Sequence, residues 1–257
     1  MNKETIKWED ITLSDNYLFQ TYMKDENNCK ELLSEILGKP VRKIVYKETE
    51  KELKNSILAK GIRVDVYLEG DDKIYDVEMQ TSEDDLPKRS RYYHSAIDID
   101  SLQPGQYYND LKETYVIFIC TFDPLEKGAY VYNIQNQCTN IQDCDYNDES
   151  HTIFLNTKGE KGNISDDLKV FLKAVDGMFD SSVKSATIKK RIADIVDNEK
   201  WRKSYMFQDM RDIGNVRKGK EEFALTMVRK GKITIEEASE ELGTPVEKLK
   251  AKLEDSK

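Results

Sequence analysis

Three side chains able to bind a metal ion or to orient water lie at alternate positions of two neighbouring segments. Asp65 belongs to the segment 63–69, and Glu78 and Gln80 belong to the segment 74–80. Apolar residues fill the other alternate positions, which is the period of a β-strand. The connection is short, so we expect a hairpin in which paired residue numbers sum to 143. Asp65 then lies opposite Glu78, with Cβ atoms about 4.5–5.5 Å apart, and a register two residues different makes them diagonal neighbours.

Two carboxylates placed opposite each other repel unless a cation lies between them. Hard divalent cations such as Mg²⁺ prefer carboxylate and carbonyl oxygens, so the pair is a candidate metal site. The alternative is that Asp65 and Glu78 are two separate acids on a solvent-exposed face. That alternative is the ordinary one in a chain with 49 Asp and Glu residues, and the surrounding elements decide between the two.

Histidine and cysteine usage narrows the chemistry further. The chain has two histidines and four cysteines, and no cysteine pair has a two-residue zinc spacing. A site with several histidine ligands and a Ser-His-Asp or Cys-His mechanism are therefore both disfavoured. We expect any chemistry to depend on carboxylates, amides and lysines, and the cysteines to be reduced thiols.

The predicted elements around the hairpin alternate between helix and strand. Ser82 is a candidate N-cap for the helix that follows the hairpin, and a nearly continuous apolar run at 113–120 predicts a buried strand. From about residue 165 the pattern becomes helical, and it ends in a helix-turn-helix-like pair. The expected helices cover 14–22, 28–37, 82–102, 166–175, 185–206 and 233–253, and the expected strands begin near 43 and cover 63–69, 74–80, 113–120, 128–134 and 152–155.

The stretch from Gly61 to Gln80 resembles the core motif of the PD-(D/E)XK nuclease superfamily. More narrowly, it is similar to a bacterial family of recombination-promoting nucleases and transposases. The resemblance continues through Arg91-Tyr-Tyr-His-Ser, Gly105-Gln-Tyr-Tyr and the buried strand. It implies an α/β, restriction-endonuclease-like core of order αβββαβ, with a mixed sheet flanked by helices. We expect a nuclease-like domain over 1–164 and a helical C-terminal region over 165–257.

The resemblance also implies hydrolysis of phosphodiester bonds in DNA. Asp65, Glu78 and the main-chain carbonyl of Met79 would hold Mg²⁺, with Mn²⁺ or another divalent cation as an alternative. Gln80 stands where the superfamily usually has lysine, so it can orient water but supplies no positive charge. Lys88 or Arg91 on the following helix could supply that charge. The superfamily often has an acid on its first helix, and Glu31 and Glu35 are both candidates here.

Contacts to DNA are expected from the helix that follows the hairpin. Phosphate contacts supply most non-specific affinity for DNA, and we expect Lys88, Arg89 and Arg91 to make them, with Tyr92 or Tyr93 packed on the sheet. The chain has a net charge of −9, yet 184–232 holds fourteen Lys and Arg against seven Asp and Glu. This local basic excess suits either a polyanion or a solvated helix surface.

Three function hypotheses remain at this point. The leading one is a metal-dependent DNA endonuclease associated with transposition or recombination. The second is a nuclease-fold protein that binds DNA or a partner without catalysis, and the third, weaker one is a sugar-cleaving enzyme with paired carboxylates. No apolar run reaches the roughly 20 residues that cross a bilayer, and no signal segment is visible, so we expect a cytoplasmic protein without a membrane partner. Homo-oligomers through the C-terminal helices are a further expectation.

Overall fold

The structure, a computed structural model, describes residues 7–53, 62–70, 72–141 and 143–254. The chain divides into two compact units, residues 1–197 and 198–257. The first unit contains η1 (Trp8–Asp10), α1 (Asn16–Tyr22), α2 (Glu26–Leu37), β1 (Tyr46–Leu53), β2 (Ile62–Gly70), β3 (Lys73–Gln80), α3 (Leu86–Ser101), η2 (Tyr108–Asp110), β4 (Glu113–Cys120), β5 (Val131–Ile134), β6 (Ser150–Asn156), α4 (Asp166–Val175) and α5 (Val183–Val196).

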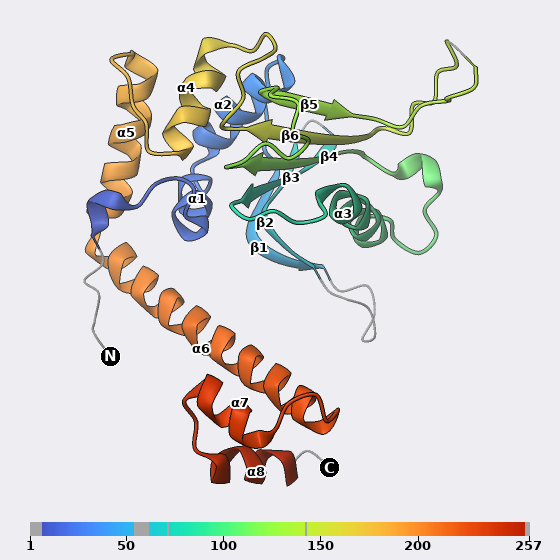
Figure 1. Cartoon of the computed structure of the whole chain (residues 1–257). Helices are drawn as coiled ribbons and strands as arrows, with labels where there is room; N and C mark the ends of the chain where they lie inside the picture. The colour runs from blue at the N-terminus through green and yellow to red at the C-terminus, as the bar shows by residue number, and fades with distance from the viewer. Residues whose placement is uncertain (1–6, 54–61, 71, 142, 255–257) are drawn as a thin grey trace. The chain divides into compact units, whose positions relative to one another are not determined.

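A six-stranded mixed sheet forms the centre of the first unit within the described residues, in the order β1-β2-β3-β4-β6-β5 (Figure 1). Strands β1, β2 and β3 are antiparallel, β3, β4 and β6 are parallel, and β5 returns antiparallel to β6. The hairpin register pairs Val66 with Val77 and Tyr67 with Asp76. Paired numbers sum to 143 as predicted, and the next pair along this register is Asp65 with Glu78. The α/β class with helices on both sides of the sheet is confirmed.

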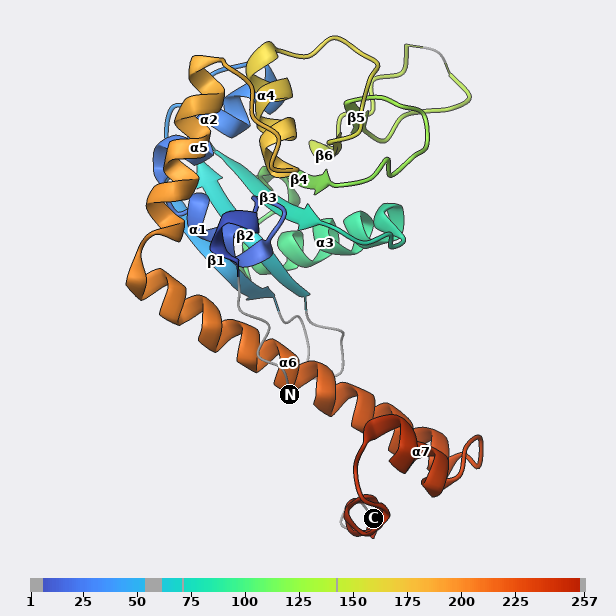
Figure 2. The same ribbon diagram turned by 60° about the vertical axis from the view of Figure 1, so that its left-hand side comes forward.

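Helices cover both faces of the sheet, as Figures 1 and 2 show. Helix α3 lies along one face, and α1, α2, α4 and α5 gather on the other. The core under α3 includes Tyr67 and Ile74 of the hairpin, Phe118 of β4, and Tyr93 and Ile97 of α3 itself. The face that carries the acids is therefore a buried face. Alternation of charged and apolar residues usually marks a half-exposed strand, but here helices cover both faces and bury both kinds of position.

Helix boundaries follow local capping chemistry. Gly38 caps the end of α2 with a φ of 62°, so the helix ends at residue 37 as expected. Helix α3 begins later than expected: Asp85 accepts a hydrogen bond from the main-chain N–H of Lys88 and is the N-cap, so the prediction of Ser82 is wrong. Pro87 then falls in the first turn, where its missing N–H costs nothing. The carbonyl of Ser82 instead accepts a hydrogen bond from the Gln80 amide.

Two helices of the C-terminal third belong to the first compact unit, whereas the sequence placed a boundary at residue 164. Helix α4 packs on α2 and α5, and α5 packs on α1. The single helix expected over 185–206 is broken at Asp197, because Asn198 accepts hydrogen bonds from the main-chain N–H groups of Lys200 and Trp201 and starts a new helix. These side-chain bonds satisfy N–H groups that would otherwise have no partner at a helix start.

The second unit consists of α6 (Glu199–Arg229), α7 (Ile235–Leu242) and α8 (Val246–Glu254). Its small core joins Ala224 and Leu225 of α6 to Ala238 of α7 and Leu249 of α8. The predicted helix pair is therefore present, and it packs on the end of α6. Among the helices that the structure describes, none combines the length and apolar character needed to cross a membrane.

Candidate active site

Four polar side chains of the hairpin are buried at the end of the sheet where β2 begins and β3 ends. Asp65 is 6% exposed, Asp76 0%, Glu78 1% and Gln80 5%. Burial of a charged group without compensation is costly, so buried acids need hydrogen bonds, a counter-ion or a proton. The alternative of two separate acids on a solvent-exposed face is therefore excluded.

The carboxylate of Asp65 is held by amides from two directions. Its Oδ1 accepts hydrogen bonds from Asn16 Nδ2 at 3.1 Å and from Gln20 Nε2 at 3.4 Å, both on α1. Its Oδ2 accepts from the main-chain N–H of Met79 at 3.2 Å. Gln20 is itself buried and donates to Asn16 Oδ1 at 3.3 Å. Sequence reasoning missed both amides, because nothing in the spacing of Asn16 and Gln20 connects them to a residue about 45 positions away.

The carboxylate of Glu78 has a donor on each oxygen. Its Oε1 accepts the main-chain N–H of Asp65 at 2.8 Å, and its Oε2 accepts Arg89 Nη2 at 2.7 Å. The other terminal nitrogen of Arg89 donates to Gln80 Oε1, also at 2.7 Å. The hydroxyl of Tyr93 accepts from Arg89 Nε and Nη2 at 2.9 and 2.7 Å. Arg89 therefore connects the two functional side chains at the end of β3.

Burial raises the pKa of the hairpin acids. The pKa of Glu78 is raised to about 8, first by burial and then by the negative charge of Asp65, while Arg89 acts in the opposite direction. Burial also raises the pKa of Asp65, against the hydrogen bonds from its amide partners. The pKa of Asp76 is raised well above its usual range by burial and by Glu78. Among the described residues, no donor reaches either carboxylate oxygen of Asp76.

The donor chemistry of this site fits a divalent cation. Three acids are buried together near one guanidinium, and their raised pKa values mean that burial disfavours the charged forms that a divalent cation would stabilise. Carboxylate and carbonyl oxygens are the ligands that Mg²⁺ prefers. No cluster of three or more His, Cys, Asp or Glu placed to hold a metal occurs in the described part of the chain. The metal ligands expected from the sequence are the carboxylates of Asp65 and Glu78 and the main-chain carbonyl of Met79.

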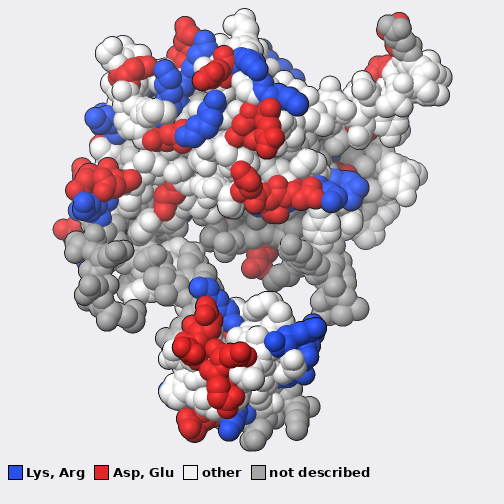
Figure 3. Space-filling model, in the orientation of Figure 1, with Lys and Arg blue, Asp and Glu red and all other residues white. Residues whose placement is uncertain are grey.

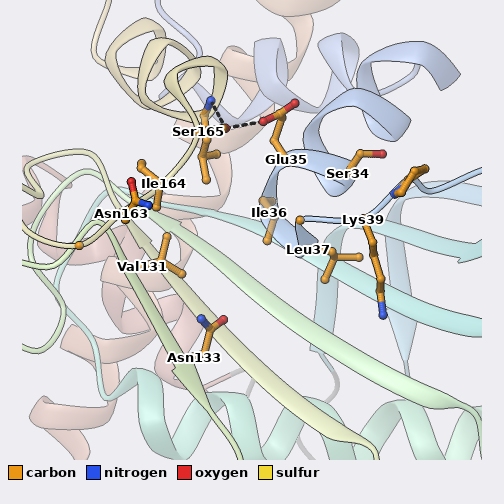
Figure 4. Close-up of a pocket in the computed structure, with 14 residues that line it drawn as sticks. Ser34, Glu35, Ile36, Leu37, Lys39, Val131, Asn133, Asn163, Ile164 and Ser165 are labelled. Carbon is orange, nitrogen blue, oxygen red and sulfur yellow. Dashed lines mark hydrogen bonds between the residues drawn. The ribbon is translucent and has the colours of Figure 1, made fainter.

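The two first-helix acids considered from the sequence have partners elsewhere. Glu31 accepts hydrogen bonds from Arg191 Nη1 and Nη2 at 2.9 and 3.1 Å and from Lys184 at 3.1 Å. The hydrogen bonds from Arg191 are the main cause that lowers its pKa to about 2. Glu35 accepts a hydrogen bond from the Ser165 hydroxyl in a separate cavity of about 690 Å³ (Figure 4). Within the described residues neither acid is hydrogen-bonded to the hairpin, whereas α1 presents amides to Asp65.

The three cations expected to contact DNA differ in position. Lys88 is exposed and pairs with Asp85 at 2.6 Å. Arg91 is exposed and lines a cavity of about 340 Å³ on the opposite flank of α3 from Arg89. Arg89 points into the site. Tyr93 is buried and Tyr92 is exposed, so one tyrosine of the pair does pack in the core. On the face shown in Figure 3, basic and acidic side chains alternate in small groups.

The mixed sheet, the acid-bearing hairpin and the helix that returns an arginine to it define an α/β protein of the PD-(D/E)XK nuclease class. Residues 14–167 match the family model described as PD-(D/E)XK nuclease family transposase. The chain belongs to this family, as the resemblance indicates. The matched span runs from the cap of α1 to the start of α4 and includes the whole sheet. The search of curated proteins found no match, and neither did the search of solved structures.

Proposed function

We propose that this chain is a metal-dependent endonuclease that hydrolyses phosphodiester bonds in DNA, in the setting of transposition or recombination. The observation that carries the proposal is the buried Asp65–Glu78 pair on adjacent strands, inside the span that matches the nuclease family. Buried like charges at one position are costly, so their retention favours a bound cation. Asp65, Glu78 and the Met79 carbonyl would hold Mg²⁺, or Mn²⁺ or another divalent cation.

A divalent cation bound there would activate water and offset charge on the phosphoryl oxygens. The protein's own contribution is to orient the carboxylates that would bind the cation. Asn16 and Gln20 orient the Asp65 carboxylate, and the main-chain N–H of Asp65 orients Glu78. Gln80, whose carbonyl oxygen is held by Arg89, would orient the attacking water by hydrogen bonding. Lys88 and Arg91 are exposed and would contact the DNA backbone.

The second candidate is a nuclease-fold protein that binds DNA or a partner without cleaving it. Two observations favour it. Gln80 replaces the lysine usual in the superfamily, and Arg89 already neutralises the Glu78 carboxylate that a cation needs. Homo-oligomers through α6, α7 and α8 would suit either candidate.

Plasmid nicking separates the two candidates. Supercoiled plasmid is incubated with wild type, Asp65→Asn and Glu78→Gln, with Mg²⁺, with Mn²⁺ and with a chelator. The matched control is Asp194→Asn, which removes an exposed acid that pairs with Lys190 on α5. Metal-dependent nicking by wild type and the control, lost in both hairpin variants, supports the endonuclease. DNA binding without nicking under every metal condition supports the second candidate.

A further inference from the structure

Arg89 is the positively charged side chain that contacts Glu78 in the structure. Its guanidinium lies 2.7 Å from Glu78 Oε2 and 2.7 Å from Gln80 Oε1, and its side chain is 27% exposed. From the sequence we expected this arginine to contact DNA. We expected Lys88 or Arg91 to supply the positive charge that Gln80 lacks. Among the described residues, the contacts instead show Arg89 as the positively charged side chain bonded to both Glu78 and Gln80.

Each oxygen of Glu78 already accepts one donor, and at Oε2 that donor is the positively charged Arg89, whose like charge would oppose a divalent cation at the same oxygen. The donor on Oε1 is the main-chain N–H of Asp65 within the hairpin. Moving it would distort the β2–β3 ladder, which also places Asp65. The donor on Oε2 is the end of a long, partly exposed side chain on α3. Rotation of the Arg89 side chain would break its hydrogen bonds to Glu78 and Tyr93, but it would leave the backbone in place.

A second anion is available to a displaced guanidinium. Asp84 Oδ2 lies 3.9 Å from Arg89 Nη1, and the Asp84 side chain is 59% exposed. A small rotation toward Asp84 would keep Arg89 paired while it leaves Glu78. It would also keep the positive charge beside Gln80, where the charge of a bound phosphate needs compensation.

We propose that Arg89 is the counter-ion of Glu78 in the metal-free protein, and that a divalent cation takes up Glu78 only as the guanidinium moves toward Asp84 or a substrate phosphate. The competition rests on the proposed function, because that function supplies the divalent cation. Two cations that compete for one carboxylate have coupled affinities, and such couplings typically change affinity by about 5–150-fold.

Calorimetric titration with Mg²⁺ alone tests the competition without any need for turnover. Wild type is compared with Arg89→Ala, Arg89→Lys and Lys190→Ala, the last being a control that removes an exposed lysine elsewhere in the unit. The titrations are run at several pH values, because Arg89 lowers the pKa of Glu78 and its removal would increase competition from a proton. Arg89→Ala is expected to bind Mg²⁺ about tenfold more tightly than wild type, with Arg89→Lys between them and the control unchanged. An Arg89→Ala affinity equal to or weaker than that of wild type, in a variant with native circular dichroism, overturns the proposal.

Asp84→Asn keeps the proposal testable if Arg89→Ala does not fold, because Asp84 is an exposed loop residue. Loss of the receiving anion is expected to weaken Mg²⁺ binding by about threefold, the scale of an exposed ion pair. Unchanged binding by Asp84→Asn would remove Asp84 from the proposal, and unchanged binding by both Asp84→Asn and Arg89→Lys would overturn it. The plasmid assay tests the endonuclease separately. Nicking by wild type without tighter Mg²⁺ binding by Arg89→Ala contradicts only the proposed competition between Arg89 and the cation. Tighter Mg²⁺ binding by Arg89→Ala without nicking by wild type contradicts only the proposed endonuclease activity.

Discussion

Asp65 and Glu78 are each held by the main chain of the opposite strand. The N–H of Asp65 donates to Glu78 Oε1 at 2.8 Å, and the N–H of Met79, the residue after Glu78, donates to Asp65 Oδ2 at 3.2 Å. These reciprocal bonds orient both carboxylates from the main chain, and side chains of α1 and α3 add further contacts. Arg89 is the longest of these side chains and is 27% exposed.

The stability of the metal-free protein is expected to fall as pH rises from about 5 to about 8. The folded pKa of Glu78, about 8, lies above its ordinary value of 4.5, so the folded state binds the extra proton in this window. Stability that depends on that proton is complete at the low end and is lost as pH rises through the folded pKa. Melting temperatures measured across this range with a chelator check the direction. Mg²⁺ should restore stability at the alkaline end, and a melting temperature that rises with pH in the chelator would contradict the assignment.

Asp76→Asn is expected to flatten that dependence on pH. Asp76 is fully buried, its pKa is raised well above the usual range, and no described donor reaches its oxygens. An asparagine has nearly the same shape and cannot ionise, so the variant lacks one of the protons whose binding stabilises the folded state. The melting temperature of the variant should therefore fall less than that of wild type between about pH 5 and 8. An equally steep fall would show that Asp76 does not contribute.

Gln20→Ala is expected to weaken Mg²⁺ binding and to reduce the free energy of unfolding by about 1 kcal/mol, the net value of a buried hydrogen bond. Gln20 donates to both Asp65 and Asn16, so its loss leaves the Asp65 carboxylate less well oriented. Calorimetry gives the first effect and urea denaturation the second. Gln103→Ala, which removes an exposed amide, is the matched control. Full metal affinity in Gln20→Ala would mean that Asn16 and Met79 suffice to orient Asp65.

Glu31→Gln is expected to leave metal-dependent nicking intact. Its carboxylate pairs with Arg191 and Lys184 on α5, so it links helices and does not reach the hairpin. The loss of stability should stay below about 1 kcal/mol, since the side chain is 40% exposed and solvent screens the pair. Because its folded pKa of about 2 lies below the ordinary value, this contribution is present above about pH 4.5 and disappears as pH falls toward 2. Loss of nicking in Glu31→Gln, with Glu35→Gln as the companion variant, would identify a first-helix metal ligand after all.

Arg91→Ala is expected to weaken DNA binding almost equally for all sequences. Arg91 is exposed on α3 and is suited to phosphate contact. Loss of one phosphate contact reduces the slope of log affinity against log salt concentration by about 1. Fluorescence anisotropy at several salt concentrations, with a chelator to prevent cleavage, measures this slope. A slope equal to that of wild type would place Arg91 outside the DNA interface.

The hairpin was predictable because its determinants are local. Period-two alternation and a short connection allow few registers, and a slip by one residue would exchange the two faces of each strand. The pairing of Val66 with Val77 confirms this prediction, and the pair Asp65 and Glu78 follows from it. The buried strand at 113–120 and the glycine end of α2 were predictable for the same reason, since each depends on residues adjacent in sequence.

Only the tertiary structure decided which groups meet the carboxylates. Arg89 and Arg91 are two positions apart on α3 and face opposite flanks of the helix, so the rotation of α3 on the sheet selects the arginine that reaches Glu78. That rotation depends on the packing of Tyr93 and Ile97 against the sheet. Sequence alone thus determined where the two acids stand on their strands. Long-range packing determined that they are buried and that amides of α1 and one guanidinium surround them, because contacts between segments far apart in the chain leave no local pattern.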